Sequence, residues 1–186
     1  RNSRLIFVTY DLNCLDVATP ILRQRVRREL GVEPSHLILL ATHNHNAPIQ
    51  INPNNFGYGE WLADQMFGLI EEAIAAEQGP AQVQFGSGDG YFITARGNAP
   101  VDYEIQLLQV TRAGAPAAML FSHGTHPAQA SRAMIDTGHP GYAMEEIEAA
   151  FPGVLAMYSD ASGGNQFPRQ PPDWQTRVTA ARDTGA

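Results

Sequence analysis

Lysine is missing from this chain of 186 residues, and all 12 of its basic residues are arginines. This absence excludes enzymes that form a Schiff base through lysine, and it excludes the phosphate-binding P-loop, whose motif needs one. Cysteine is represented by Cys14 alone, so a disulfide within the chain and a zinc site of several thiolates are excluded as well. Any zinc site here must therefore use nitrogen and oxygen ligands.

Positive charge is scarce as well. The 12 arginines stand against 19 acidic residues, and the net charge of −7 argues against nucleic acid or an anionic membrane surface as the main partner. Four of the arginines fall within residues 23–28, where we interpret them as the solvated face of a helix rather than a phosphate- or RNA-binding stripe. No run of about 20 apolar residues occurs, so the sequence predicts no transmembrane segment.

The chain does have enough apolar material for a core, since hydrophobic residues make up 44% of it and its length corresponds to one domain. Apolar runs and helical spacing predict strands at residues 5–10, 37–40, 82–85, 91–94, 103–111, 117–121 and 154–158, and helices at 20–30, 61–78 and 140–150. Strands alternating with helices predict an α/β fold with a mixed β-sheet flanked by helices. The glycine-rich residues 86–90 are interpreted as a hairpin turn, because no helix pattern follows them.

Five of the six histidines are gathered in three short segments. Residues 42–45 (Thr-His-Asn-His) follow one apolar strand, residues 122–127 (Ser-His-Gly-Thr-His-Pro) follow another, and residues 136–142 lie at a helix start. Open α/β sheets place their ligand crevice at the carboxyl ends of strands, so we expect the first two segments to face a common site. His139, in the third segment, is interpreted as a structural residue or a pocket wall.

The pair His43 and His45 has a direct physical use. Residues two apart on an extended chain point to the same side, so both imidazoles can face one cavity, and a histidine from a neighbouring strand end can join them. Zinc takes three or four ligands at about 2.0–2.2 Å, and imidazole is one of those it prefers. The sequence therefore predicts a metal site at the strand ends, of the kind that keeps a position open for water.

A tight glycine turn is expected at the same edge of the sheet, at residues 160–165. Its backbone N–H groups would line the site, where such groups stabilise a developing oxyanion. Ser162 lies in this turn and is a candidate nucleophile, although its surroundings do not have the Gly-x-Ser-x-Gly spacing of a nucleophile elbow.

In their order along the chain, these segments resemble the N-terminal catalytic domain of neutral/alkaline, non-lysosomal ceramidases and their bacterial relatives. The most specific element is the Thr-His-x-His-x-x-Pro segment at residues 42–48. The other elements that share the family's order are Asp11, Arg96, His126-Pro127, Gly141-Tyr142-Ala143 with Glu148, and residues 162–168. By this resemblance residues 1–169 are a ceramidase-like α/β catalytic domain, expected to be part of a larger domain, and residues 170–186 are a polar tail.

The resemblance implies a zinc-dependent amidase that hydrolyses an N-acyl bond. It implies that His43 and His126 are zinc ligands, that His45 lies beside the scissile carbonyl, and that Arg96 lines the same site. These roles agree with the chemistry of the side chains, because a neutral imidazole transfers protons and a guanidinium holds an oxyanion.

The chain also departs from the family pattern. The family's Gly-Asp-x-Ser-Pro segment reads Gly-Asn-Gln-Phe-Pro at residues 164–168, so Phe167 stands where the family has its catalytic serine. Asn46-Ala47 replaces the usual Ser-Gly before Pro48, and the family's glutamate and tyrosine ligands have no counterpart in these 186 residues.

Three hypotheses follow. The first is a zinc-dependent hydrolase that cleaves an amide or related acyl bond of a small or lipid-like substrate. The second is a catalytically inactive domain that keeps the fold and binds a metal or another ligand. The third is a serine hydrolase that uses Ser162.

Overall fold

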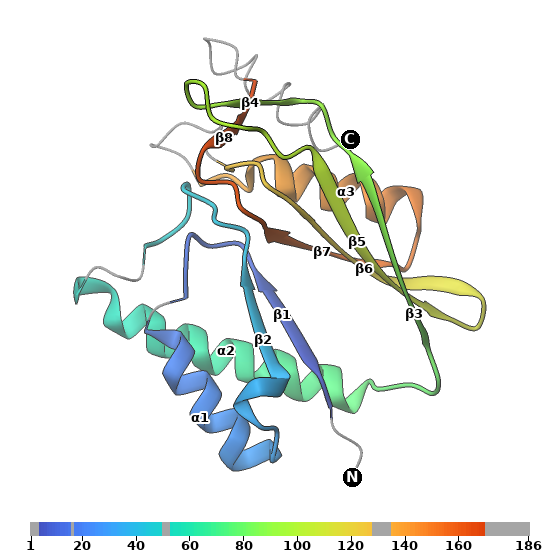
Figure 1. The fold of residues 1–186 in the computed structure, drawn as a ribbon. Coiled ribbons are helices and arrows are strands. Elements are labelled where there is room, and N and C mark those ends of the chain that lie inside the picture. The colour runs from blue at the N-terminus through green and yellow to red at the C-terminus, as the bar shows by residue number, and fades with distance from the viewer. Residues whose placement is uncertain (1–3, 16, 50–52, 128–134, 170–186) are drawn as a thin grey trace.

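The computed structural model of the chain describes residues 4–15, 17–49, 53–127 and 135–169 (Figure 1). The fold is α/β, with a mixed sheet flanked by helices, as the sequence predicts. The strands are β1 (Ile6–Tyr10), β2 (Leu37–Ala41), β3 (Gln82–Asp89), β4 (Ile93–Ala95), β5 (Glu104–Arg112), β6 (Ala115–His123), β7 (Leu155–Asp160) and β8 (Gln166–Pro168). The helices are α1 (Ala18–Leu30), α2 (Phe56–Ala75) and α3 (Gly138–Ala150), with short 3₁₀ turns at Pro34–His36 and Pro53–Asn55.

The main sheet has the order β3-β5-β6-β7. Strand β5 is antiparallel to both β3 and β6, and β6 is parallel to β7. Strands β1 and β2 pair in parallel, and both contact β7, so they continue this layer. The carboxyl ends of β1, β2, β6 and β7 consequently meet at one edge, where open sheets bind their ligands.

Helices α1 and α2 pack against β1 and β2 and bury the main hydrophobic core. Leu22 and Val26 of α1 and Phe67 of α2 are almost completely buried in it. Alternate strand residues such as Val8 and Leu39 point into this core, as the period of a strand requires. Helix α3 covers β7, and Tyr158 lies buried beneath it. The carboxyl-end edge of the sheet is therefore held on a well-packed base.

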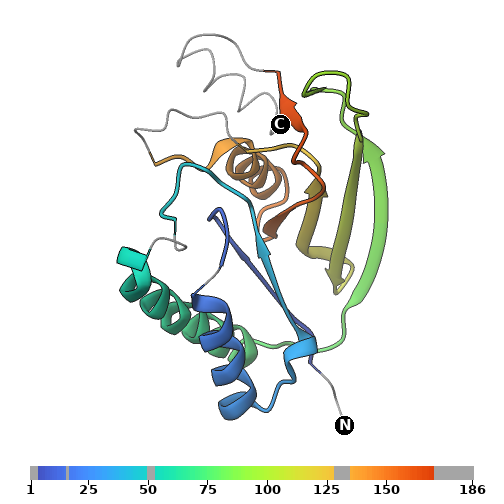
Figure 2. The ribbon, with the colours of Figure 1, turned by 60° about the vertical axis from the view of Figure 1, so that its left-hand side comes forward.

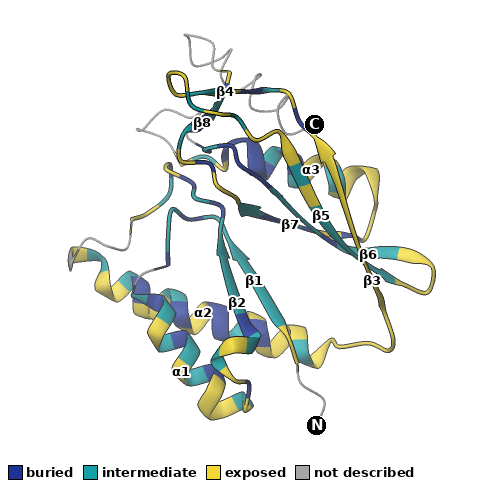
Figure 3. Ribbon diagram, in the orientation of Figure 1, coloured by how far each residue is buried: buried dark blue, intermediate teal, exposed yellow. Residues whose placement is uncertain are grey.

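The opposite face of the sheet carries apolar side chains that no described helix covers. Phe7 of β1, Phe85 of β3, and Leu108 and Leu120 line two adjoining hollows of about 590 and 610 Å³. Figure 2 shows α1 and α2 on the far side of β1 and β2 from β3. Strand β3 is exposed along its whole length (Figure 3), and the side chain of Phe85 is 80% exposed.

The interpretation of residues 86–90 as a hairpin turn is wrong. Residues 86–89 continue strand β3, which pairs with β5 along its full length in an unbroken register. Strand β4, expected as the partner of the strand at 82–85, pairs instead with β8. Glycine is tolerated here because β3 is an exposed edge strand, so the pairing to β5 rather than side-chain packing determines its conformation.

Other boundaries differ by a few residues. Helix α2 begins at Phe56, five residues before the predicted start, and α3 begins at Gly138. Residues 166–168, where the sequence analysis predicts no strand, form β8 because β4 supplies a partner. The predicted polar tail, residues 170–186, lies outside the described residues. None of the described helices combines the length and apolar character that a membrane span needs.

His139 is a buried residue of the first turn of α3, only 3% exposed, and its ring packs edge-on against Tyr158 at 5.9 Å. This agrees with its interpretation as a structural residue. Burial lowers its pKa to about 3, with His123 contributing in the same direction.

This burial makes folding sensitive to acid. Between the folded pKa of about 3 and an unfolded pKa near 6.5, the unfolded chain binds a proton that the folded chain does not, so stability falls as pH falls. Between pH values of about 7 and about 5, we expect wild-type protein to lose roughly 2 kcal/mol more than His139→Gln. Urea unfolding at both pH values measures the difference, and equal losses would contradict it.

Candidate metal centre

The loop after β2 presents two histidines to one side and anchors itself on the other. Thr42, Asn44 and Asn46 are 2%, 1% and 8% exposed, whereas His43 is half-buried and His45 is exposed. This alternation keeps the polar amides and the hydroxyl inside while both imidazoles face outward. It is present although the backbone is not a regular strand, since His43 has a positive φ and residues 45–47 form a bend. The sequence pattern therefore correctly predicts that the two rings share a side.

Asp11, at the end of β1, anchors this loop. Its Oδ1 accepts hydrogen bonds from Thr42 Oγ1 at 2.7 Å and from Asn44 Nδ2 at 3.1 Å. Asn44 Nδ2 also donates to the backbone carbonyl of Asp136 at 2.6 Å, and its Oδ1 accepts from the Asn46 backbone N–H at 2.8 Å. Burial raises the pKa of Asp11, and the bonds from Thr42 and Asn44 oppose that rise. The loop is thus fixed to β1 and to the segment before α3.

The ring of His43 is oriented as in many metal sites, by a hydrogen bond at the ring nitrogen that does not face the cluster. The φ of His43, 62°, lies in the left-handed region, which histidine adopts more readily than most residues but still at a cost. Its Nδ1 lies 3.1 Å from the backbone carbonyl of Asn13, a bond that requires the proton on Nδ1 and leaves the lone pair on Nε2. In a histidine that binds a metal through one ring nitrogen, the other ring nitrogen usually donates a hydrogen bond, often to a backbone carbonyl.

His126 reaches the same place from the end of β6. Its backbone N–H donates to the carbonyl of Gln166 at 3.0 Å, which ties it to the start of β8. The buried Gln166 side chain passes so close to Gly124 that a Cβ there would lie 2.6 Å from Nε2 of Gln166. The glycine of the His-Gly-Thr-His segment is needed for this close approach, which sets the direction in which His126 leaves the strand.

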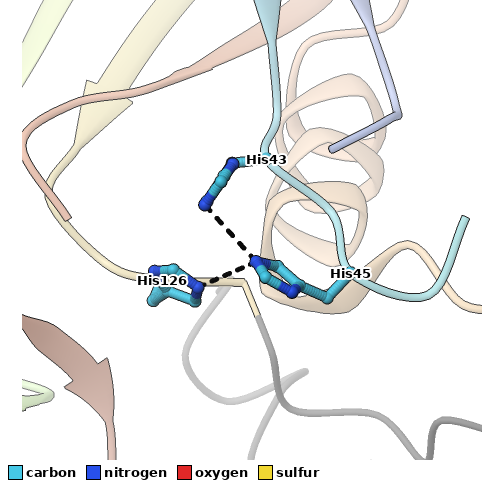
Figure 4. Close-up of side chains that lie close together, drawn as sticks. All are labelled: His43, His45 and His126. Carbon is cyan, nitrogen blue, oxygen red and sulfur yellow. Dashed lines mark hydrogen bonds between the residues drawn. The ribbon is translucent and has the colours of Figure 1, made fainter. Parts of the chain in front are cut away.

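The three imidazoles of His43, His45 and His126 converge on one point (Figure 4). Nε2 of His45 lies 3.3 Å from Nε2 of His43 and 2.9 Å from Nε2 of His126, and the ring centroids are 4.6 to 4.8 Å apart. Two nitrogens bound to one tetrahedral zinc at about 2.0–2.1 Å lie about 3.3 Å from each other. The two distances from Nε2 of His45 are near this value, and all three nitrogens lie within 4.8 Å of one another, so the cluster could hold a shared metal ion.

The protonation state expected for His126 also suits metal binding. Burial lowers the pKa of His126, and the neighbouring rings of His43 and His45 lower it further. Metal ligation requires neutral imidazole, so a ring that resists protonation is prepared to bind. Nδ1 of His126 is buried and has no hydrogen-bond partner within the described part of the chain.

Arg96 stands at the rim of the cluster. Its backbone N–H bonds to the carbonyl of Asn165 at 2.7 Å, and its guanidinium lies 4.8 Å from the ring centre of Phe167. Phe167 in turn packs on the ring of His126, with centroids 5.1 Å apart. Arg96 is close enough to lower the pKa of His126 slightly, and its side chain is exposed. The aromatic ring thus holds a cation beside the histidines.

Asp160, at the end of β7, borders the cluster. Burial raises the pKa of its carboxyl group to about 6, and the nearby His43 is the largest influence in the opposite direction. Oδ1 of Asp160 is buried and accepts no hydrogen bond from the described residues. Ser162, two residues later, is exposed, and within the described residues its hydroxyl bonds to no histidine.

The structure therefore brings together His43, His45, His126 and Arg96, all of which the sequence analysis names, and leaves His139 outside. It adds three residues to which that analysis gave no role at the site: Asp160, Asp136 and Gln166. Asp160 ends a strand beside His123 of β6, and this position was the signal that could have indicated it.

No family model and no curated protein sequence matches this chain. Its fold, however, matches solved structures. The crystal structure of neutral ceramidase from Pseudomonas aeruginosa superposes with a TM-score of 0.82 at 20% identity, over 97% of this chain and 35% of that one. A ceramidase complexed with C2 gives a TM-score of 0.83 at 20% identity, over 100% of this chain and 34% of that one. The resemblance to ceramidases is thus confirmed in the fold, and the chain spans about a third of their length.

The geometry predicts one metal site per chain. Titration of metal-free protein with zinc should saturate at one equivalent, and His43→Ala and His126→Ala should each weaken binding about tenfold or more, because each removes a donor nitrogen. His36→Ala is the matched control, since His36 lies on the turn before β2 and outside the cluster. Competition with a chromophoric chelator measures the affinities. If all three variants bound zinc as wild-type does, the cluster would not be the site.

Proposed function

We propose that the protein is a zinc-dependent hydrolase that cleaves an amide (N-acyl) or related acyl bond of a small or lipid-like substrate. The convergence of three imidazole nitrogens within 4.8 Å of one another, at the strand ends of a ceramidase-like fold, is the observation that supports it most strongly. The proteins of similar structure are ceramidases, and the class of substrate is extended from them to this chain as part of the proposal.

In this proposal His43 and His126 hold the metal. Zinc at this position would polarise a carbonyl group and bring the pKa of a water molecule toward about 7. His43 is suited to the task because the Asn13 carbonyl fixes its tautomer, and His126 because burial keeps its ring neutral. The ring of His43 is held by the Asn13 carbonyl, and the backbone of His126 is held by the Gln166 carbonyl.

His45 and Arg96 are the residues that would act on the substrate. His45 is the exposed member of the cluster, so its ring is accessible to a bound substrate and can accept and return a proton at Nε2. Arg96 is held beside His126 by the ring of Phe167, where its guanidinium can bind the oxygen on which negative charge develops.

Phe167 excludes a serine nucleophile at the family's usual position, so this proposal gives attack on the acyl carbon to water. Ser162 does not replace that serine, because it is exposed and makes no hydrogen bond to a histidine among the described residues. We therefore place the serine-hydrolase hypothesis below the metal-dependent one.

A screen of N-acyl and ester substrates tests the function. We expect hydrolysis that a chelator abolishes and zinc restores. His45→Ala should lower kcat about 10²- to 10⁴-fold while zinc still binds, and Arg96→Ala should lower it about 10²- to 10³-fold. Ser162→Ala is the control and should keep wild-type activity. Bound zinc without turnover of any substrate would favour the inactive, ligand-binding alternative, and chelator-resistant activity lost in Ser162→Ala would favour a serine hydrolase.

We also propose that the apolar face of the sheet is where further chain of the same protein packs. Phe85 and Val83 of β3 are 80% and 55% exposed beside the two hollows, an amount of apolar surface that soluble domains rarely leave bare. The similar ceramidase structures are about three times as long as the part matched here, which supports a larger domain.

For the isolated chain, Val83→Thr with Phe85→Gln should reduce the binding of a hydrophobic dye and reduce self-association. Stability should change by only about 0.5 kcal/mol, because both side chains are exposed. Leu69→Gln is the control, since Leu69 is 60% exposed on α2 and away from the hollows. Dye fluorescence and size-exclusion chromatography measure the result. A double variant that binds as much dye as wild-type would contradict the proposal.

A further inference from the structure

Three imidazoles leave the charge of a divalent cation uncompensated, because neutral histidine contributes no negative charge. The acidic residues that could compensate this charge lie at the ends of the strands around the cluster. Asp11 is engaged by Thr42 and Asn44, and its role is to anchor the loop. The carboxylate of Asp136 accepts hydrogen bonds from the Gly138 N–H and from Tyr142, and so is also engaged. Asp160, at the end of β7, is a further acidic residue at this edge.

One carboxylate oxygen of Asp160 makes no hydrogen bond within the described residues. This atom, Oδ1, is also shielded from solvent. A buried carboxylate oxygen without a donor loses its hydration and gains nothing in return, so such an atom needs an explanation. A cation bound beside this oxygen would account for the histidines as well.

The backbone of Gly163 lies between this oxygen and the main chain of His126. A Cβ on Gly163 would lie 3.0 Å from Oδ1 of Asp160 and 3.3 Å from the backbone nitrogen of His126. Asp160 stands outside the group of three ligand atoms that lie within 4.8 Å of one another, so it would act on the site from beside it. The backbone of Gly163 is itself fixed by its N–H bond to the carbonyl of Ala161 at 2.8 Å. Asp160 is also close enough to His43 for that ring to lower the pKa of the carboxyl group.

We propose that Asp160 acts beside the metal centre, supplying the negative charge that a divalent cation among His43, His45 and His126 requires. This inference rests on the metal-dependent function proposed above. The resemblance to ceramidases drawn from the sequence gives Asp160 no role. Its carboxylate acts from the end of β7.

The Asp160→Asn variant tests this role, because asparagine keeps the shape and removes the charge. Its zinc affinity should fall about 10- to 100-fold, which is the usual effect of removing a partner behind a metal site. Asp89→Asn is the matched control: Asp89 also ends a strand, is exposed on β3, and changes the net charge equally. Its affinity should stay within about twofold of wild-type.

Thermal stability separates an electrostatic role from a structural one. Without metal, Asp160→Asn should be at least as stable as wild-type at a pH near 7, because burial disfavours the charged carboxylate. With zinc in excess, wild-type should gain more in melting temperature than the variant, because it binds the metal more tightly. A variant that is destabilised without metal and gains as much from zinc as wild-type would show that Asp160 serves the fold alone.

The outcomes are distinguishable from those of the proposed function. Zinc binding in wild-type and in Asp160→Asn with affinities within about twofold would overturn the role of Asp160 and leave the function standing. Absence of zinc binding in wild-type would overturn both. Should Asp160→Asn fail to fold, wild-type protein labelled with carbon-13 at the aspartate carboxyl groups answers the question, because zinc must then shift the Asp160 signal and leave that of Asp89 in place.

Discussion

The site depends on one constraint: the loop after β2 must keep alternate residues buried and anchored, so that His43 and His45 both face outward. Asp11 provides the anchor by accepting hydrogen bonds from Thr42 and Asn44, the two residues that alternate with the histidines. A shift of the loop by one residue would turn both imidazoles into the protein and both anchors out. The carboxylate at the end of β1 therefore determines the direction of His43 and His45 without touching either ring.

The sequence was informative where the periodicity of apolar and polar residues, or the residue type alone, is sufficient to predict the structure. The alternation of residues 42–46 and the apolar strands before the histidines predicted which rings would converge, and the α/β class followed from strands alternating with helices. The sequence was less informative about pairing partners. Nothing local in residues 86–90 distinguishes a glycine-rich turn from an edge strand, because the hydrogen bonds to β5 that decide it come from residues 104–107.

The same reason explains why Asp160 and Gln166 were missed as members of the site. Asp160 matters because β7 lies parallel to β6, which brings the two strand ends together, and Gln166 matters because its side chain passes beside Gly124. Both relations are tertiary, and no spacing within the sequence encodes them. The stacking of Arg96 on Phe167 is similar, since it follows from the pairing of β4 with β8. Phe167 thus lies between the guanidinium of Arg96 and the ring of His126.

The central claim is that the rings of His43, His45 and His126 surround a metal ion, and anomalous X-ray scattering at the zinc absorption edge tests it most directly. In a crystal grown with zinc, the account predicts one strong anomalous peak about 2.0–2.1 Å from Nε2 of His43 and of His126. A map with no peak at this cluster, from crystals of protein saturated with zinc in solution, would contradict the account.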